Sequence, residues 1–252
     1  MKGLHVMFLF LMTLSVGTVF GKEQHETDVI PTKAGDLTIT FLGHGSLLFS
    51  FGGMNIAIDP YGKVADYTTL PKADIILVTH EHGDHLDPVA IKAIRSDRTV
   101  VAANPAAAEK IPGAMVLKNG DRKRFPGARK NSGGIEVTAV PAYNIVHERG
   151  PGVPFHPKGN GNGYVLTFGG KRVYVAGDTE NIPEMKTHAG VDIAFLPMNL
   201  PYTMTPEMVA DAARMIHPKI LYPYHYGDTD TSRIVGLLRD RKDIEVRIRQ
   251  MR

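Results

Sequence analysis

The sequence predicts a single α/β domain, and three observations lead to this prediction. The chain has 252 residues, of which 43% are hydrophobic and 22% charged, so a packed core is expected and extensive disorder is excluded. Short runs rich in Ile, Val and Phe alternate with helix-like segments, as in α/β proteins. A weak internal similarity relates the segment with Asp59 and Asp74 to the segment with Asp178 and Asp192. Two such halves would bring acidic and His side chains to one shared sheet edge.

The start of the chain is predicted to be a signal peptide over residues 1–21. Lys2 precedes an apolar stretch, and small residues at positions 19 and 21 suit a cleavage site after Gly21. Residues 22–35 would then form a loose polar arm, and residues 36–252 the domain. The alternative is a retained membrane anchor, because the stretch nearly reaches spanning length. After cleavage we expect a periplasmic or secreted protein without a stable membrane span.

The expected strands are short and are separated by turn residues. The first three are joined by Gly-containing turns, as in an antiparallel meander, and the fourth is wholly apolar, as in a buried strand. The strands are expected at residues 37–41, 46–51, 54–58, 75–78, 99–103, 135–140, 164–168, 173–176, 193–196, 220–222 and 244–248.

Four helices are expected from their start signals. Asp87 can cap a helix over residues 88–95, which has Pro88 in its first turn, and Thr205 can cap a helix over residues 206–216. The two shorter helices are expected at residues 105–110 and 231–239.

The composition excludes several kinds of chemistry. The chain contains no Cys, which rules out disulfides, thiolate metal sites and a cysteine nucleophile. A net charge of +3 does not indicate nucleic-acid binding, and the basic residues 118–130 are predicted to form a solvated hairpin. The Gly- and Pro-rich residues 150–163 are predicted to be a loop, either functional or disordered. Carboxylates and the 11 His must hold any bound metal.

The strongest chemical signal is the segment Thr79-His80-Glu81-His82-Gly83-Asp84-His85, which directly follows an apolar strand. Three His and one Asp in six residues supply the nitrogen and oxygen donors of a zinc-type site. A solvated polar turn is the alternative, but three His on one turn serve no packing purpose. One short loop cannot saturate two ions, so Asp178 and His225 are expected to join it. Considered alone, each residue has a structural alternative. Asp178 could cap a helical turn, and His225 could be a half-buried His packed among tyrosines.

These motifs resemble those of the metallo-β-lactamase superfamily. His80-Glu-His82-Gly-Asp84-His85 matches its His-x-His-x-Asp-His motif, and Gly-Asp178-Thr and His225-Tyr-Gly match its later metal motifs. The segments around His44 and Asp59 are similar to the branch with the ascorbate-phosphate lactonase and the N-acylphosphatidylethanolamine phospholipase D. The resemblance covers nearly all of residues 37–228. It implies a four-layer αββα sandwich with a two-metal site at one edge of the paired sheets.

The resemblance also implies individual roles. It implies two divalent metal ions, for which Zn is expected and Mn or Fe is also suitable. The implied ligands are His80 and His82 for the first ion, Asp84, His85 and His225 for the second, and Asp178 as a bridge. Asp59 is implied to orient a ligand His through the second nitrogen of its ring.

One position departs from the family pattern. A further His usually ends the strand before the Gly-Asp-Thr motif, but Asn144 stands there. His156 and His147 are the candidate replacements. We prefer His156 because Pro154 and Pro157 stiffen its segment, although it could also contact substrate. His147 is more typical of a solvated loop residue. If neither His binds the first metal ion, the chain is expected to hold a single ion.

The predicted activity is hydrolysis by a hydroxide shared between two metal ions, with Asp84 orienting it or accepting its proton. His44 and Tyr202 are candidate substrate contacts, although a backbone-bonded His and a surface Tyr explain them equally well. The expected substrate is a small metabolite or lipid with an ester, lactone or phosphodiester bond. The alternatives are a β-lactamase and a non-enzymatic metal-binding protein. No nucleic-acid partner is expected, because the chain is too short for the second domain found in nucleases of this superfamily.

Overall fold

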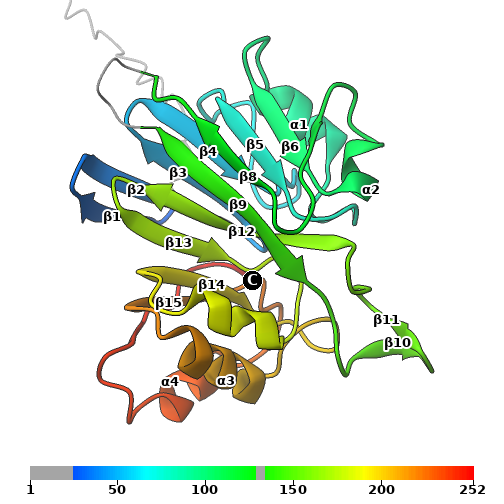
Figure 1. The fold of residues 1–252 in the computed structure, drawn as a ribbon, viewed down its shortest axis with the longest axis vertical. Coiled ribbons are helices and arrows are strands. Elements are labelled where there is room, and N and C mark those ends of the chain that lie inside the picture. The colour runs from blue at the N-terminus through cyan, green and yellow to red at the C-terminus, as the bar shows by residue number, and fades with distance from the viewer. Residues whose placement is uncertain (1–24, 129–133) are drawn as a thin grey trace, which may run out of the picture.

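The computed structural model describes residues 25–128 and 134–252. The predicted signal peptide, the first three residues of the predicted arm, and Arg129 and Lys130 of the basic segment lie outside these ranges. Two sheets of seven strands form the body of the described chain, and a separate two-stranded ribbon projects from it (Figure 1). None of the helices in these ranges is long and apolar enough to cross a membrane.

The first sheet follows the order of the chain. Its strands are β1 (Thr27–Thr32), β2 (Gly35–Gly43), β3 (Ser46–Phe51), β4 (Met54–Ile58), β5 (Ile75–Val78), β6 (Val100–Ala103) and β7 (Met115–Val116). Neighbours from β1 to β4 pair antiparallel, and neighbours from β4 to β7 pair parallel.

The second sheet repeats this division. In spatial order its strands are β16 (Glu245–Val246), β15 (Ile220–Tyr224), β14 (Ile193–Pro197), β13 (Lys171–Val175), β12 (Gly161–Phe168), β9 (Ile135–Ala142) and β8 (Arg122–Phe125). The strands from β13 to β16 pair parallel, and those from β8 to β13 pair antiparallel. The parallel halves of the two sheets contain the two similar segments of the sequence.

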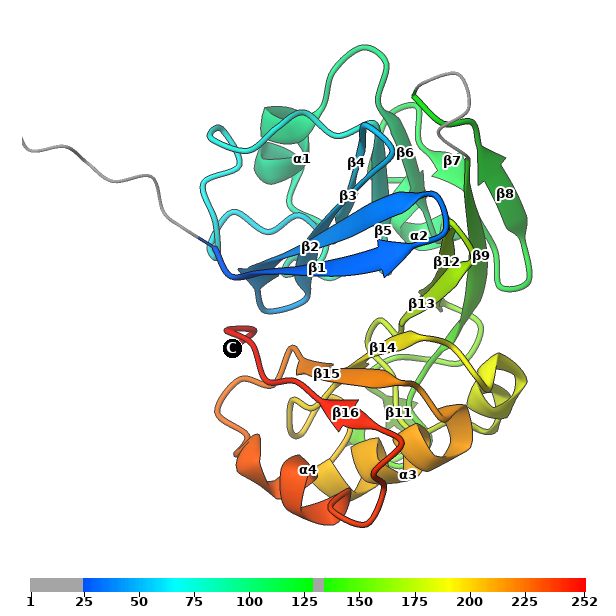
Figure 2. The ribbon, with the colours of Figure 1, turned by 90° about the vertical axis from the view of Figure 1, so that its left-hand side faces the viewer.

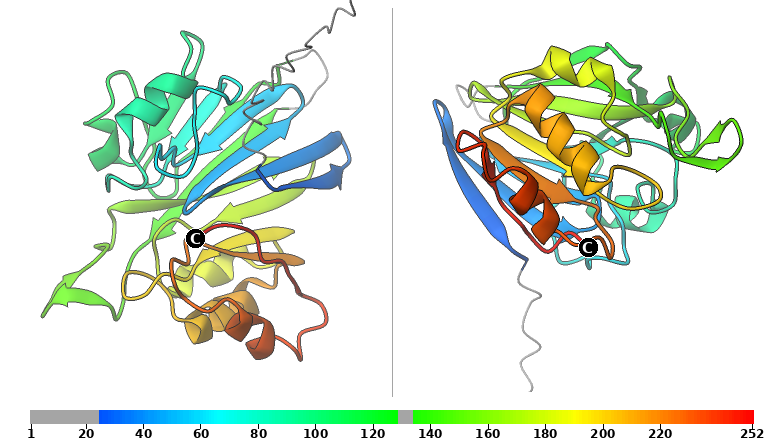
Figure 3. Two further views of the ribbon diagram at one scale, coloured as in Figure 1. Left: turned by 180° about the vertical axis from the view of Figure 1, so that it is seen from behind. Right: turned by 90° about the horizontal axis from the view of Figure 1, so that it is seen from below.

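Helices cover the outer face of each sheet (Figures 2 and 3). The first sheet carries α1 (Pro88–Ile94) and α2 (Pro105–Ala108), and the second carries η1 (Pro183–His188), α3 (Pro206–Ile216) and α4 (Ser232–Leu237). The predicted four-layer αββα sandwich is therefore confirmed. Between the sheets, the Phe41 ring packs against Phe195 and Tyr222, with centroids 6.3 and 5.1 Å apart. Burial of each such side chain stabilises the sandwich by about 1.5–3 kcal/mol.

Helix starts follow the signals read from the sequence. The Asp87 carboxylate accepts hydrogen bonds from the first turn of α1, and the Thr205 hydroxyl accepts one from the first turn of α3. By contrast, Thr231 makes no side-chain cap, and α4 is shorter than predicted. The predicted last strand likewise shrinks to the two residues of β16.

The prediction of a loose N-terminal arm is wrong for the described residues. Thr27–Thr32 form β1, an edge strand that pairs with β2 along its whole length. Ile30 is the one buried residue of β1, so the strand lacks the alternation that predicts sheet structure. Its position depends instead on the turn at Gly35, where φ is 109°, and on an ion pair of Asp28 with Arg249 at 2.7 Å. A local sequence pattern cannot show such a long-range contact.

The Gly- and Pro-rich segment is more regular than predicted. β10 (Glu148–Gly150) and β11 (Val153–Pro154) form the projecting ribbon, and β12 begins already at Gly161. Glycine is needed in this part of β12, because a Cβ atom on Gly163 would lie 2.6 Å from the carbonyl oxygen of Ala176. Because Gly161 and Gly163 have no side chains, the start of β12 lacks the alternation of apolar and polar residues by which a strand is predicted.

Candidate metal centre

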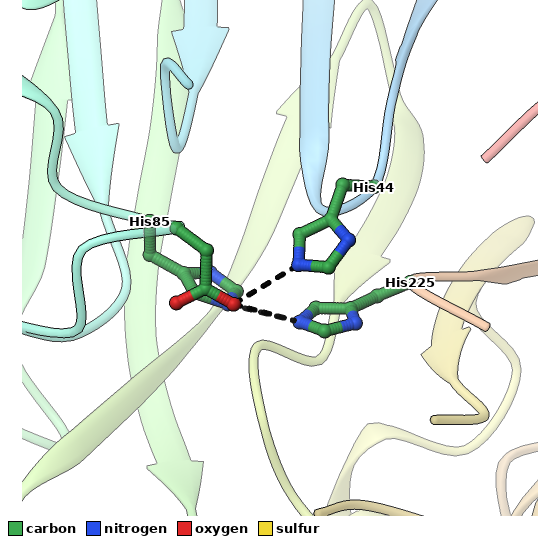
Figure 4. Close-up of side chains that lie close together, drawn as sticks. His44, His85 and His225 are labelled. Carbon is green, nitrogen blue, oxygen red and sulfur yellow. Dashed lines mark hydrogen bonds and ion pairs between the residues drawn. The ribbon is translucent and has the colours of Figure 1, made fainter. Parts of the chain in front are cut away.

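The loops that follow the parallel strands meet at one edge of the two sheets. His85 and His225, which come from different sheets, point toward one another there, together with His44 from the turn after β2 (Figure 4). The residues that follow β4, β5, β13, β14 and β15 include Asp59, Thr79, Asp178, Asn199 and His225. Strand ends of this kind form the usual ligand site of open α/β sheets.

The His-rich loop after β5 has a fixed fold. The backbone N–H groups of His85 and Leu86 both donate to the carbonyl of His82, at 3.0 and 2.8 Å. The buried Leu86 side chain packs into the apolar cluster beneath α1 and anchors the loop. Asp59 accepts hydrogen bonds from the backbone N–H and the hydroxyl of Thr79, each at 2.7 Å. The loop therefore presents its imidazoles from a rigid base.

Three His side chains from two loops form the first cluster. One ligand atom each of His80, His82 and His156 lie within 4.8 Å of one another. Nε2 of His80 is 3.0 Å from Nδ1 of His82, and Nε2 of His156 is 3.3 Å from Oδ2 of Asp178. Of the two candidates for the missing ligand, the structure brings His156 to this cluster.

The second cluster combines Asp84, His85 and His225. The Nε2 atoms of His85 and His225 are 3.1 Å apart, and Oδ2 of Asp84 lies 3.7 and 3.6 Å from them. His44, one of the two candidate substrate contacts, also lies here. Its Nε2 atom is 3.0 Å from Oδ2 of Asp84, and its ring centroid is 3.7 Å from that of His225.

The backbone around this cluster adopts unusual conformations. His44, Asp59 and His225 all have positive φ angles, of 52°, 44° and 46°. The N–H of His225 donates to the carbonyl of His44 at 3.0 Å, and the N–H of His44 donates to the carbonyl of Arg252 at 3.2 Å. Such strained backbone is held in place by its surroundings and concentrates at functional sites.

Asp178 lies between the two clusters and is buried. Its Oδ2 atom faces His156, and its Oδ1 atom lies 3.4 and 3.5 Å from Nε2 of His85 and His225. The chain reaches the position of Asp178 through Gly177. Only glycine suits that position, because φ is 67° and a Cβ atom would lie 2.5 Å from the carbonyl oxygen of Asn162. Within the described part of the chain, Oδ1 of Asp178 accepts no hydrogen bond that meets normal geometry.

Two residues orient the His side chains of the second cluster. Oδ2 of Asp59 lies 2.8 Å from Nδ1 of His85, so the Nε2 atom of His85 faces the site. The side-chain amide of Asn199 lies 3.2 Å from Nδ1 of His225. Sequence reasoning missed Asn199, because nothing in its local sequence links it to a His 26 positions later.

Asn144 and Glu180 form a chain of hydrogen bonds that holds His156, a member of the first cluster, in place. Oδ1 of Asn144 accepts hydrogen bonds from the backbone N–H and from Nδ1 of His156, at 2.8 and 2.7 Å. The Asn144 amide in turn donates to the buried Glu180 carboxylate at 3.0 Å. Glu180 also accepts the backbone N–H groups of Ile145, Val146 and His147, each at 2.7 Å. Nothing in the local sequence indicates this role for Glu180.

His147 lies outside both clusters. Its Nδ1 atom is 2.7 Å from Oε1 of Glu180. Tyr202 lies at the rim of the site, 46% exposed, and its ring meets Phe155 edge-on with centroids 5.1 Å apart. Neither side chain belongs to the groups that could hold a metal ion among the described residues.

Burial and neighbouring charges shift pKa values at the site. Burial lowers the pKa of His80 well below its ordinary value, and the nearby His85 lowers it further. Burial opposes ionisation of Asp178, but the charges of His225 and His85 outweigh it and hold the pKa well below its ordinary value. Burial opposes protonation of His85, but the carboxylates of Asp178 and Asp59 outweigh it and raise the pKa of His85 well above its ordinary value. A divalent cation binds neutral imidazoles, so an ion at the second cluster would displace this proton.

The residues present fit a pair of metal ions. Nitrogen and carboxylate donors converge in two adjacent groups, and a buried carboxylate oxygen between them lacks a hydrogen-bond donor. A cavity of 20 Å³ reaches the first group between His82, Phe155, His156 and Asp178. A larger hollow of 550 Å³ beside α1, lined by Lys92, Arg95 and Lys110, contains none of these ligands. The cluster chemistry, not the size of the hollow, identifies the site.

Comparison with known families agrees with this geometry. Residues 38–225 match the model of the beta-lactamase superfamily domain, and this range contains both clusters. The chain belongs to the metallo-β-lactamase superfamily. It is 33% identical over 207 residues to a UPF0173 metal-dependent hydrolase of Symbiobacterium thermophilum, a match that covers 76% of this chain and 84% of the relative. This relative bears the name metal-dependent hydrolase, as does one of Pelotomaculum thermopropionicum, and this chain is a metal-dependent hydrolase of the same superfamily.

Solved structures show the same superfamily fold. A crystal structure from Parabacteroides distasonis, described as that of a metal-dependent hydrolase, has 50% sequence identity and a TM-score of 0.83, and the match covers 91% of this chain and all of that one. The metallo hydrolase Igni18 of Ignicoccus hospitalis has 21% identity and a TM-score of 0.67, covering 84% of this chain and 94% of its own. At that identity the second likeness shows the fold alone.

Proposed function

We propose that this metallo-β-lactamase-fold protein is an exported hydrolase that uses two divalent metal ions, with zinc as the expected metal. Its proposed substrate is a small metabolite or lipid with an ester, lactone or phosphodiester bond. The position of Asp178 carries the proposal. One of its oxygens faces His156 of the first cluster and the other faces His85 and His225, as expected of a carboxylate shared by two ions.

The proposed ligands divide between the two clusters. They are His80, His82 and His156 for one ion, Asp84, His85 and His225 for the other, and Asp178 for both. Two ions at these positions would lower the pKa of a water molecule and polarise a carbonyl or phosphoryl oxygen. His44 has a ring nitrogen near the second group and also contacts Asp84, so it can orient that carboxylate.

Asp84 is the proposed proton acceptor. Its side chain is 36% exposed, whereas that of Asp178 is 4% exposed. Water and substrate therefore reach Asp84 more readily than Asp178. Burial alone would raise the pKa of Asp84, but hydrogen bonds with His225 and His44 hold it below its ordinary value. Asp84 is thus ionised at neutral pH, as a proton acceptor must be.

Metal content and hydrolysis of the purified chain test this proposal together. The chain is purified without chelators, supplied with Zn, Mn or Fe, and measured by mass spectrometry of its metals. We expect close to two ions per chain, and cleavage of at least one member of a panel of esters, lactones and phosphodiesters. His82→Ala should lose both metal and activity. His188→Ala, which alters a His remote from the clusters, serves as the matched control.

Other outcomes would favour the alternatives. Turnover of a chromogenic cephalosporin, without cleavage of the panel, would identify a β-lactamase. Two bound ions without any hydrolysis would indicate a metal-binding protein, and one ion or none would contradict the two-metal site. Export is tested separately by sequencing the N-terminus of the protein after secretion, since cleavage after Gly21 is expected.

A further inference from the structure

An arginine at the edge of the first cluster has no assigned role. Arg149 belongs to the projecting β10–β11 ribbon, and its Nη2 atom lies 3.2 Å from Nε2 of His82. The guanidinium also lies over the Phe155 ring, 5.4 Å from its centroid, and is 3.5 Å from the Phe155 carbonyl. The ribbon thus brings a positive charge to the rim of the metal centre.

The contact between Arg149 and His82 is incompatible with metal binding by His82. Nδ1 of His82 faces His80 in the first cluster, so Nδ1 is the nitrogen available to a metal ion. A neutral imidazole carries one hydrogen, and binding through Nδ1 leaves that hydrogen on Nε2. Two donors then face each other at 3.2 Å, and the guanidinium must turn to another acceptor.

The chain itself offers Arg149 no anionic acceptor in the described residues. The ion pairs of this part of the chain leave Arg149 without a carboxylate partner, and its contacts are those with His82 and Phe155. The adjacent Glu148 accepts the backbone N–H of Gly152 at 2.9 Å and so closes the ribbon turn. An exposed guanidinium that has no anionic partner among the described residues, beside a candidate metal centre, is suited to bidentate binding of a carboxylate or phosphate group.

Aromatic side chains lie beside this charge. Phe155 and Tyr202 meet edge-on beside the cluster, and Phe155 lines the cavity that reaches His82 and Asp178. Exposed aliphatic residues also occur close to His147, Phe155 and Tyr202 in the sequence. They are Ile145 (52% exposed), Val146 (63%), Val153 (54%) and Leu200 (42%). Exposed apolar groups that gather at a site, rather than scatter, mark a binding surface.

We propose that Arg149 and the Phe155–Tyr202 pair form a substrate subsite for an anionic group that is attached to an apolar chain. This inference rests on the proposed hydrolase site and names the class of its substrate: amphiphilic anions. Carboxylate and phosphate share the required chemistry, because both accept two parallel hydrogen bonds from a guanidinium. The anion would take the place of His82 as the partner of Arg149, and the apolar chain would lie on the aromatic pair.

Calorimetric titration of the zinc-loaded protein tests the subsite without relying on turnover. The probes are hexyl phosphate, hexanoate, 1-hexanol and inorganic phosphate. We expect hexyl phosphate or hexanoate to bind at least tenfold more tightly than both 1-hexanol and inorganic phosphate. Whichever anion binds more tightly identifies the headgroup. Equal binding of hexyl phosphate and inorganic phosphate would overturn the apolar part of the proposal.

Two variants separate the charge from the apolar surface. Arg149→Gln should weaken the hexyl anion at least tenfold and leave 1-hexanol unchanged, while Phe155→Ala should weaken both. Arg98→Gln, an exposed arginine of the first half of the chain, is the matched control. Direct coordination of the anion by zinc is the competing explanation, and it predicts equal binding by wild type and Arg149→Gln. That result, with unchanged zinc content, would overturn the proposal.

The same variants distinguish this proposal from the hydrolase itself. If esters are cleaved but Arg149→Gln binds the anions as wild type does, the subsite is wrong and the hydrolase stands. If the anions bind through Arg149 but no ester, lactone or phosphodiester is cleaved, the hydrolase is wrong and a ligand-binding site remains.

Discussion

Oδ1 of Asn144 accepts two hydrogen bonds from a single residue, the backbone N–H and the Nδ1–H of His156, at 2.8 and 2.7 Å. The orientation of the amide is fixed, because its nitrogen donates to Glu180 and to the carbonyl of Tyr202 at 3.0 and 2.9 Å. With the hydrogen on Nδ1, the lone pair of His156 is on Nε2, which faces Asp178. Asn144, which stands where we expected a ligand His, thus positions His156 instead.

We predict that Asn144→Ala weakens metal binding without removing a ligand. Loss of the acceptor frees the His156 ring to rotate and to change tautomer, and removal of such a supporting partner costs about 10–100-fold in metal affinity. Competition with a chelator at fixed zinc concentration measures the change. Asn144→Asp keeps the acceptor and should lose less. Equal affinity of wild type and Asn144→Ala would contradict the positioning role.

His156→Ala and His147→Ala form a matched pair of substitutions. The structure places His156 in the first cluster and His147 beside Glu180. We therefore expect His156→Ala to reduce the metal content from two ions toward one, and His147→Ala to retain both. Metal analysis of the two purified variants decides the matter. Loss of metal from His147→Ala alone would reverse the assignment.

The contacts of Asp28, which are remote from the metal centre, should contribute to stability in a pH-dependent way. Its carboxylate contacts the Tyr222 hydroxyl, Arg247 and Arg249 and so ties β1 to the second sheet. Burial opposes the shift, but these hydrogen bonds lower the pKa of Asp28 below its ordinary value of 3.8. Asp28→Asn should reduce the free energy of unfolding by about 2 kcal/mol at pH 7, since bonds to charged groups contribute this much.

The sign of the pH effect follows from the lowered pKa. A carboxylate with a lower pKa in the folded state stabilises the protein above its unfolded pKa, and the gain is lost as the pH falls through the folded value. The difference between wild type and Asp28→Asn should be constant from about pH 7 to pH 5 and should shrink below about pH 4. Urea unfolding at several pH values measures it, with the exposed Asp97→Asn as control. A difference that grows on acidification would refute this account.

Metal removal should lower the melting temperature. The clusters hold buried imidazoles and a buried carboxylate oxygen without a hydrogen-bond donor, so the folded state binds metal ions that the unfolded chain cannot. Ligand present at a hundred times its dissociation constant stabilises by about 3 kcal/mol, which is about 6–12 °C for a domain of this size. Calorimetry before and after chelation should show this fall and its reversal by zinc. His82→Ala, which keeps the ligands of the second cluster, should show a smaller response than wild type.

Much of the site follows from local sequence. His80, His82, Asp84 and His85 lie in one turn after an apolar strand, so their proximity requires only that this strand be formed. Helix starts at Asp87 and Thr205 are equally local, because each cap bonds to backbone groups two or three residues away. The family motifs extended this reading to Asp178 and His225, and with them to the αββα sandwich.

Only the tertiary structure decided the features that depend on distant partners. β1 exists because of its pairing with β2 and the contacts of Asp28 with residues more than 200 positions away. His156 reaches the first cluster because Asn144 and Glu180, on two other segments, hold it there. Arg149 meets His82 because the β10–β11 ribbon, although distant in sequence from the His-rich loop, places the Arg149 side chain beside it. Such contacts leave no periodicity or cap in the local sequence, since their energy arises between segments that are adjacent only in the folded chain.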